Sequence, residues 1–256
     1  MYAAERQQEI LELIRQEDWV GVQDLAERFS ITRETARRDL TDLEKRGLVR
    51  RAHGGAQRVE RVSFSSPVTD RGNLYSKEKI AIAQAAYATV TDNSTIAIDA
   101  GTSTIKLAEL IPIDRKLTVV TYSLLVSSML ANHRDVQVMQ LGGIIQSNSR
   151  SAVGPWTASE VERITIDAAF LSVDGVSTER GITTHNLGEA TVKTAFMKAA
   201  RRTVVLADHS KFGREEFGRI ATLGQVDHII TDDIVDPAYV SDIEAQGPRV
   251  TVVNAR

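Results

Sequence analysis

The sequence contains no cysteine. Disulfide bonds, thiolate nucleophiles and cysteine-ligated metal sites are therefore excluded. It also lacks a long apolar run, because its longest apolar stretches have the length of a strand and are interrupted by charge, so no membrane span is expected. The first ten residues, MYAAERQQEI, contain no basic region followed by an apolar segment, which argues against a secretory signal and predicts a cytoplasmic protein. We find no internal repeat and no low-complexity segment.

The 256 residues that are present are enough for one large α/β domain and a smaller one. Hydrophobic residues make up 42% of the chain and charged residues 25%, as in an ordinary globular protein. The net charge is −3, yet residues 33–58 carry eight basic and four acidic side chains, a local charge of +4. A basic segment on an acidic chain favours an anionic partner such as nucleic acid.

Residues 1–58 predict three helices followed by a hairpin. Apolar residues at helical spacing form the buried faces of the first two helices: Ile10, Leu11, Leu13 and Ile14, then Val22, Leu25, Ala26 and Phe29. Thr32 suits the N-cap of a third helix over about 33–46, which Gly47 would end. The pair Gly54-Gly55 inside residues 48–56 favours a tight hairpin turn.

Residues 59–75 lose the apolar periodicity and gather serine, proline and glycine, which predicts a linker. Residues 76–256 alternate helical segments with short β-branched runs. Such alternation predicts βαβ units and a mainly parallel sheet with helices on both faces. The runs are residues 95–98, 117–121, 136–141, 168–173, 203–207, 228–231 and 249–253.

The third helix is expected to present a basic, hydrogen-bonding face. At about 100° per residue, Ala36, Leu40 and Leu43 point together toward the core, and the arginines lie on the opposite arc. This is the arrangement of a helix-turn-helix recognition helix, in which arginine binds guanine edges and threonine binds bases or phosphate. A three-helix bundle with a solvated face is the alternative, although a bundle needs no basic hairpin. The predicted DNA contacts are Thr32, Arg33, Thr35, Arg37, Arg38, Arg51 and His53.

The segment DAGTST, residues 99–104, lies between a predicted strand and a predicted helix. Backbone N–H groups at a helix start and small hydroxyl side chains can hold a phosphate, so residues 101–104 fit one, although an N-capped turn is an alternative. Three further segments follow strands or open helices: 174–175, 188–193 and 208–213. The carboxyl ends of parallel strands meet at one sheet edge, so all four segments can gather there. Taken separately, the three further segments could be a turn, a surface Glu189–Lys193 ion pair and a solvated cation, Lys211.

Two groups of residues carry a resemblance to a known family. The stretch TRETARRDLTDLEKRGLVRRAHGGA, residues 32–56, resembles the winged helix-turn-helix of the DeoR family of bacterial transcriptional repressors. The later segments, in the same order as in that family, resemble its sugar-phosphate-sensing effector domain, which is similar to ribose-5-phosphate isomerase. The resemblance therefore covers nearly the whole chain. It implies a winged helix-turn-helix domain over 1–58 and a Rossmann-like α/β effector and oligomerisation domain over 76–256.

The resemblance also implies roles for individual residues. Gly101, Thr102, Ser103 and Thr104 would hold phosphate; Asp174, Glu189 and Lys193 would meet sugar hydroxyls; and Lys211 would close on the ligand. Asp99 is assigned to shaping the loop or binding a hydroxyl, because a carboxylate beside a phosphate would repel it. Ser149 is a further expected contact, and Arg150 stands where family members more usually carry a small residue.

Two functions follow. The first is a repressor that binds double-stranded operator DNA and a phosphorylated sugar, with no catalytic residue, metal or cofactor, acting as a homodimer or homotetramer. The second is a sugar-phosphate isomerase with an appended DNA-binding arm, for which Asp174 and Glu189 would supply acid and base. The repressor hypothesis uses both halves of the chain, whereas the isomerase hypothesis leaves the winged module unexplained.

Overall fold

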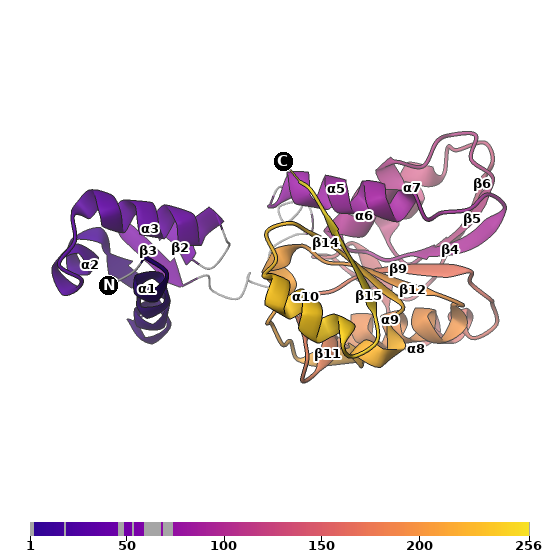
Figure 1. Cartoon of the computed structure of the whole chain (residues 1–256). Coiled ribbons are helices and arrows are strands. Elements are labelled where there is room, and N and C mark those ends of the chain that lie inside the picture. The colour runs from indigo at the N-terminus through magenta and orange to yellow at the C-terminus, as the bar shows by residue number, and fades with distance from the viewer. Residues whose placement is uncertain are drawn as a thin grey trace. The chain divides into compact units, whose positions relative to one another are not determined.

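The computed structural model describes residues 3–17, 19–45, 49–52, 54–58, 68 and 74–255. The chain divides into two compact units, Met1–Phe64 and Ser65–Arg256, each described by itself below (Figure 1). Among the described residues, no helix combines the length and the apolar character needed to cross a membrane.

The described residues of the first unit form three helices and a small antiparallel sheet. The helices are α1 (Ala3–Glu17), α2 (Val22–Arg28) and α3 (Arg33–Lys45), and the strands are β1 (Trp19–Gly21), β2 (Val49–Ala52) and β3 (Gly55–Arg58). The three predicted helices and the hairpin are confirmed. Thr32 caps α3 as predicted, because its Oγ1 accepts a hydrogen bond from the N–H of Thr35 over 3.1 Å. The predicted helix end at Gly47 lies outside the described residues.

The hairpin is one strand wider than the sequence predicted. The sheet order is β1-β3-β2, so Trp19–Gly21 pairs with the outer side of β3. Gly54 supports the turn with φ +77, a conformation that suits glycine. The predicted core positions Ala36, Leu40 and Leu43 are fully buried and pack against α1, α2 and the sheet. The wing is thereby tied to the helices through a shared core.

Asp39 on α3 anchors α1 inside this unit, a role that the sequence analysis missed. Its carboxylate is 4% exposed and accepts hydrogen bonds from Arg6 Nε at 2.7 Å and from Arg6 Nη2 at 3.2 Å. Gln7 Nε2 donates a third bond, at 3.3 Å. The hydrogen bond to Asp39 raises the pKa of the Arg6 guanidinium above its ordinary value. The pair therefore fixes the first helix against the third.

Replacing Arg6 with alanine should destabilise the first unit by about 1–3 kcal/mol, because the Asp39 carboxylate then remains buried with its main donor removed. The matched control is Arg28→Ala, which removes an exposed ion pair to Glu17 and should cost at most about 1 kcal/mol. Urea unfolding in a Trp156→Phe background measures this, since the chain has two tryptophans and Trp19 then reports on the first unit. Equal losses in the two variants would contradict the anchoring role of Asp39.

The second unit is built on a seven-stranded, wholly parallel sheet, and every predicted strand is present in it. The order is β15-β14-β12-β9-β4-β5-β6. The bounds are β4 (Ser94–Ile98), β5 (Leu117–Thr121), β6 (Val136–Gln140), β9 (Ala168–Ser172), β12 (Thr203–Leu206), β14 (His228–Asp232) and β15 (Arg249–Val253). The chain runs outward from β4 to β6 and then returns to place β9 on the other side of β4. The strand order reverses between β4 and β9.

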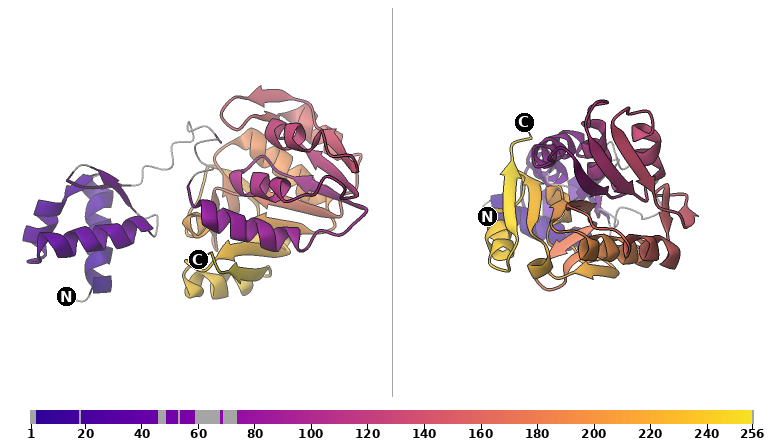
Figure 2. Two further views of the ribbon diagram at one scale, coloured as in Figure 1. Left: turned by 90° about the horizontal axis from the view of Figure 1, so that it is seen from above. Right: turned by 90° about the vertical axis from the view of Figure 1, so that its right-hand side faces the viewer.

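Helices cover both faces of this sheet, as the two views of Figure 2 make clear. One face carries α5 (Ser76–Tyr87), α6 (Thr102–Glu109) and α7 (Leu124–Leu130); the other carries α8 (Pro155–Val161), α9 (Leu187–Ala199) and α10 (Pro237–Glu244). Side chains alternate between the two cores along each strand. Ile96 and Ile98 lie in the α5–α6–α7 core, whereas Ala97 faces α8 and α9.

Short antiparallel strands lie beside the central sheet. One hairpin is β7 (Ile144–Gln146) with β8 (Ser151–Val153), and a three-stranded sheet contains β10 (Gly175–Ser177), β11 (Gly181–Thr184) and β13 (Gly218–Ala221). Two 3₁₀ turns, His209–Lys211 and Leu223–Gln225, follow β12 and β13. The hairpin and the small sheet bring residues 146–150 and 174–185 toward the carboxyl end of the central sheet.

Candidate functional site

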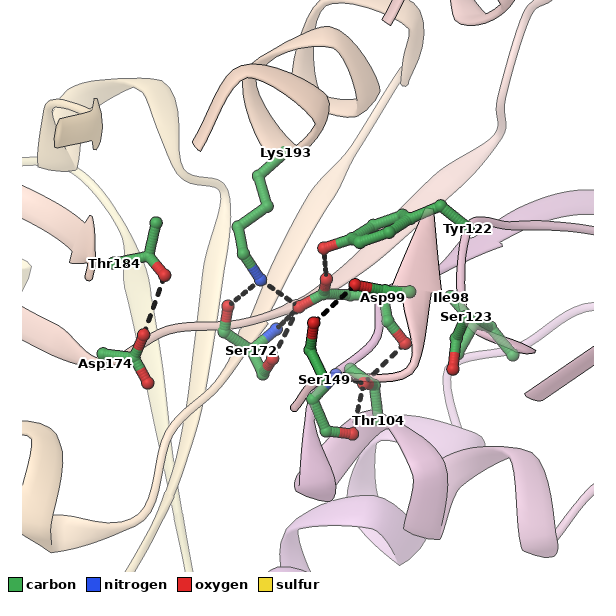
Figure 3. A network of polar contacts seen from close by, with 12 residues as sticks. Ile98, Asp99, Thr104, Tyr122, Ser123, Ser149, Ser172, Asp174, Thr184 and Lys193 are labelled. Atoms are coloured by element: carbon green, nitrogen blue, oxygen red, sulfur yellow. Dashed lines mark hydrogen bonds and ion pairs between the residues drawn. The ribbon is translucent and has the colours of Figure 1, made fainter. Parts of the chain in front are cut away.

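The switch in strand order places a cluster of charged and hydroxyl side chains at the carboxyl ends of β4 and β9. Open α/β sheets bind their ligands outside these strand ends at such a switch point. Asp99 follows β4 directly, Ser172 ends β9, and Tyr122 follows β5. Lys193 reaches the same point from α9 (Figure 3).

The Asp99 carboxylate is the centre of this cluster and is fully buried. Its Oδ2 accepts hydrogen bonds from the N–H of Ser172 at 2.8 Å, from Ser172 Oγ at 2.5 Å and from Lys193 Nζ, and its Oδ1 accepts one from Tyr122 Oη. Burial opposes ionisation of Asp99, but the charge of Lys193 and the hydrogen bonds outweigh it and hold its pKa below the ordinary value. Asp99 is therefore a paired carboxylate, and both of its oxygens are used within the protein.

The DAGTST loop leads into α6 with a glycine at the helix N-cap. Gly101 is the N-cap residue, so no N-cap side chain occupies the first N–H groups of the helix. A Cβ at Gly101 would lie 1.7 Å from Ser172 Oγ, so this position requires glycine. Thr104 turns inward: its Oγ1 accepts from the N–H of Gly101 at 3.1 Å and bonds the Asp99 carbonyl at 2.9 Å. The Thr104 hydroxyl therefore shapes the loop, while its phosphate role stays a prediction.

Glu189 lies beside the Asp99–Lys193 pair with an unsatisfied carboxyl oxygen. It is 7% exposed, and its Oε1 is buried without a hydrogen-bond partner among the residues that the structure describes. Burial raises the pKa of Glu189; Lys193 opposes this rise, and the nearby Asp99 and Asp174 carboxylates add to it. The expected alternative, a Glu189–Lys193 pair on the surface, is wrong, because both side chains are buried and Lys193 Nζ bonds Asp99 and the Ser172 carbonyl.

Asp174 is held by two residues that the sequence analysis did not single out. Its Oδ2 accepts bonds from Thr184 Oγ1 and interacts with His185 Nδ1, each at 2.7 Å. Burial opposes ionisation, but the hydrogen bond with His185 and the positive charge of Lys211 bring the pKa of Asp174 far below its ordinary value. Asp174 is therefore a carboxylate at neutral pH.

Two loops border this region. Ser149 is buried in the turn between β7 and β8, and its Oγ lies 2.7 Å from Ser151 Oγ. Arg150 beside it is exposed and has φ +48. Lys211 ends the 3₁₀ turn after β12, and its side chain is half-buried.

Within the described residues, no group of three or more His, Asp or Glu side chains is placed to hold a metal ion.

The second candidate surface is the face of α3 in the first unit. Thr32, Arg33, Arg37 and Arg38 are exposed, and Thr35 is half-buried. Arg37 carries a long ion pair, 3.7 Å, to the exposed Glu34. Arg51 Nη1 donates to Thr41 Oγ1 at 2.9 Å and to the Arg37 carbonyl at 3.3 Å, so it fixes β2 against α3. His53 lies outside the described residues.

A helix-turn-helix unit with a basic exposed helix, followed by an α/β unit with a charged site at its switch point, has the organisation of a transcription regulator with a separate sensor domain. A model described as the DeoR-like helix-turn-helix domain matches residues 6–62, and one described as the DeoR C terminal sensor domain matches residues 75–233. The chain belongs to the DeoR family of transcriptional regulators.

Relatives of similar length support this assignment. The HTH-type transcriptional regulator YulB of Bacillus subtilis is 35% identical over 99% of this chain and 98% of its own. GlpR of Haloferax volcanii is also 35% identical, over 99% of this chain and 98% of its own. A putative aga operon transcriptional repressor of Escherichia coli O157:H7 is 29% identical over 98% and 94%.

A solved structure of ribose 5-phosphate isomerase A from Neisseria gonorrhoeae superposes with a TM-score of 0.40 at 19% identity over 55% of each chain. The predicted fold class, a winged helix-turn-helix followed by a parallel-sheet α/β domain, is confirmed.

Proposed function

We propose that this regulator represses a carbohydrate uptake or catabolism operon and that a phosphorylated sugar bound at the β4–β9 switch point lowers its affinity for operator DNA. The observation that carries the proposal is the buried Oε1 of Glu189, which lacks a hydrogen-bond partner among the described residues. A buried polar atom of this kind is costly unless a ligand or water satisfies it. A sugar hydroxyl would supply the missing partner.

The phosphate would bind at the start of α6. The first N–H groups of a helix have no intrahelical acceptor and carry the positive end of the helix dipole. Thr102 and the buried Ser103 add hydroxyl groups at this terminus. Lys211 would supply a cation from its loop, and its charge already acts on Asp174. Phosphate and hydroxyls of one ligand would thus be recognised by separate groups.

The protonation of the site favours binding over turnover. A general base works best when its pKa lies near the operating pH. Asp174 has a strongly lowered pKa and contacts Thr184 and His185 through its carboxylate. The Asp99 carboxylate is already paired with the ammonium group of Lys193. We therefore include in the proposal that the ligand is sensed and released unchanged. The isomerase alternative needs Asp174 and Glu189 as an acid–base pair; burial raises the pKa of Glu189, but Asp174 stays ionised and hydrogen-bonded within the protein, so the pair is incomplete.

The proposal places the protein in the cytoplasm, where it meets its operator, as a homodimer or homotetramer assembled through the sensor domain. Symmetric operators are read by symmetric oligomers. The DNA contacts would come from Thr32, Arg33, Thr35, Arg37 and Arg38, with Arg51 and His53 on the wing.

A thermal-shift panel of phosphorylated and free sugars tests the ligand class. A phosphorylated sugar at about a hundred times its Kd should stabilise the protein by about 2.7 kcal/mol and raise Tm by several degrees, whereas the free sugar should not. Ser103→Ala should reduce the shift, because it removes a hydroxyl from the phosphate end, while Ser159→Ala, on the exposed surface of α8, should keep it. The stabilising sugar should also release operator DNA in a gel-shift titration. Stabilisation by unphosphorylated sugars alone would contradict the proposal.

A further inference from the structure

The chain that enters the sensor domain is fixed to the first loop of the candidate site. Val68 is 1% exposed, and its N–H donates to the carbonyl of Asn148 over 2.8 Å. Asn148 precedes Ser149 in the turn between β7 and β8. This turn is itself held against the start of α7, because the N–H of Leu124 donates to the Arg150 carbonyl at 2.9 Å. Val68 is therefore hydrogen-bonded to the loop that carries Ser149.

The same entering chain is fixed to the second loop a few residues later. The ring of Tyr75 packs edge-on against His209, with ring centroids 4.8 Å apart. Lys79 Nζ forms a buried ion pair with Asp208 at 3.1 Å and also bonds the Leu74 carbonyl. Tyr75 adopts a left-handed backbone conformation, φ 54, at the N-cap of α5, which is uncommon for a residue other than glycine. The loop 208–211 carries Lys211. It is held to the end of β14 by the bond between His209 Nδ1 and Asp232 Oδ1, 2.9 Å.

The charge of Lys211 acts on both sides of this loop. Within the candidate site, burial raises the pKa of Asp174, whereas the hydrogen bond with His185 and the charge of Lys211 lower it. At the Lys79–Asp208 ion pair, burial lowers the pKa of Lys79, the charge of Asp208 raises it, and the charge of Lys211 lowers it further. An anion that binds Lys211 therefore changes the field at the Lys79–Asp208 pair as well as at the site.

We propose that Val68 and residues 74–79 form a coupling segment that transmits effector binding to the DNA-binding unit. The inference rests on the proposed function and specifies its regulation. A phosphorylated ligand that contacts Ser149 and Lys211 shifts the loops 146–150 and 208–211. Because Val68 and Tyr75 are bound to these loops, the shift reaches the chain that leads to the first unit. Two contacts on two different loops give the segment a defined position in each ligation state, as coupling through a physical network requires.

The test compares the full-length protein with the variant Val68→Ser/Tyr75→Ala. The ligand is the panel sugar phosphate that stabilises the wild type most, with inorganic phosphate in parallel. Operator affinity is measured with and without ligand by fluorescence anisotropy, and ligand binding is measured by calorimetry. The wild type should lose operator affinity about tenfold or more on saturation. The variant should bind the ligand, and should bind operator DNA in the absence of ligand, with affinities within about threefold of the wild-type values. Saturation with ligand should lower its operator affinity by less than about threefold.

Leu74→Ala is the matched control, since the Leu74 side chain is 51% exposed and its bond to Lys79 uses the backbone carbonyl. This variant should retain the full ligand response. The single variants Val68→Ser and Tyr75→Ala should each show a partial loss, which keeps the test valid if the double variant is unstable. A full response in folded double and single variants would overturn the coupling segment. A wild type whose operator affinity no sugar phosphate changes would instead overturn the proposed function, and the inference with it.

Discussion

Replacing both Arg37 and Arg38 with alanine should weaken operator binding by about 30-fold or more at constant salt. The two guanidinium groups are exposed on α3 beside the capped N-terminus of the helix, where a recognition helix meets base edges. A bidentate arginine contact to guanine is worth about 1–3 kcal/mol, so the loss of two corresponds to at least about 2 kcal/mol. An operator selected from a randomised duplex library with the wild type provides the DNA for a gel-shift titration.

The folded state should be almost unaffected in this variant, because both side chains lie on the surface and the Arg37–Glu34 ion pair is long and exposed. Arg201→Ala removes an arginine that is 75% exposed in the sensor domain, and it should leave operator binding unchanged. Thermal shifts with a sugar phosphate should be the same in all three proteins. If the double variant bound the operator as tightly as the wild type, α3 would not be the recognition helix.

Replacing Lys193 with methionine should cost the sensor domain about 3–5 kcal/mol of unfolding free energy, since it leaves the fully buried Asp99 carboxylate without its cation. Asp99→Asn/Lys193→Met, which removes both charges, should recover a large part of this loss. Lys198→Met on the exposed side of the same helix controls for the change in side chain. Chemical denaturation followed by circular dichroism measures each value.

The effect of Lys193→Met should also depend on pH. In the wild type the pKa of Asp99 is lowered in the folded state, so this group contributes stability above its unfolded pKa and loses it as the pH falls through the folded value. Without Lys193, burial raises the folded pKa of Asp99, and protonation on acidification then relieves the buried charge. The stability difference between the two proteins should therefore shrink as the pH falls. A difference that is constant with pH would contradict the assigned charge state of Asp99.

The central sheet could be predicted from the sequence strand by strand, because parallel strands buried on both faces appear as short continuous β-branched runs. The run at residues 117–121 matches β5 in both bounds. The strands β1, β10 and β13 could not be predicted in this way. They are three or four residues long and contain glycine, serine or tryptophan, and their pairing is set by tertiary contacts.

The location of the candidate site could be predicted for a similar reason, since the carboxyl ends of parallel strands share one edge. The hydrogen bonds within the site could not be predicted. Tyr122 and Ser172 contact Asp99 only through the register of β4, β5 and β9, and the sequence contains no motif that marks them. Lys193 was expected to meet a sugar hydroxyl, and the structure instead pairs its ammonium with Asp99. Its contact with a ligand stays a prediction.

The hydrogen bonds of Asp99 also affect the order in which the parts of the protein can fold during synthesis. Its partners Tyr122, Ser172 and Lys193 lie 23, 73 and 94 residues further along the chain. The last described strand of the winged unit, by contrast, ends at Arg58. At a synthesis rate of roughly 5–20 residues per second, the ~135 residues from Arg58 to Lys193 take on the order of ten seconds to add. During that interval a nascent chain can fold its winged unit but still lacks the Asp99–Lys193 ion pair, so we expect the winged unit to form before the sensor domain can respond to a ligand.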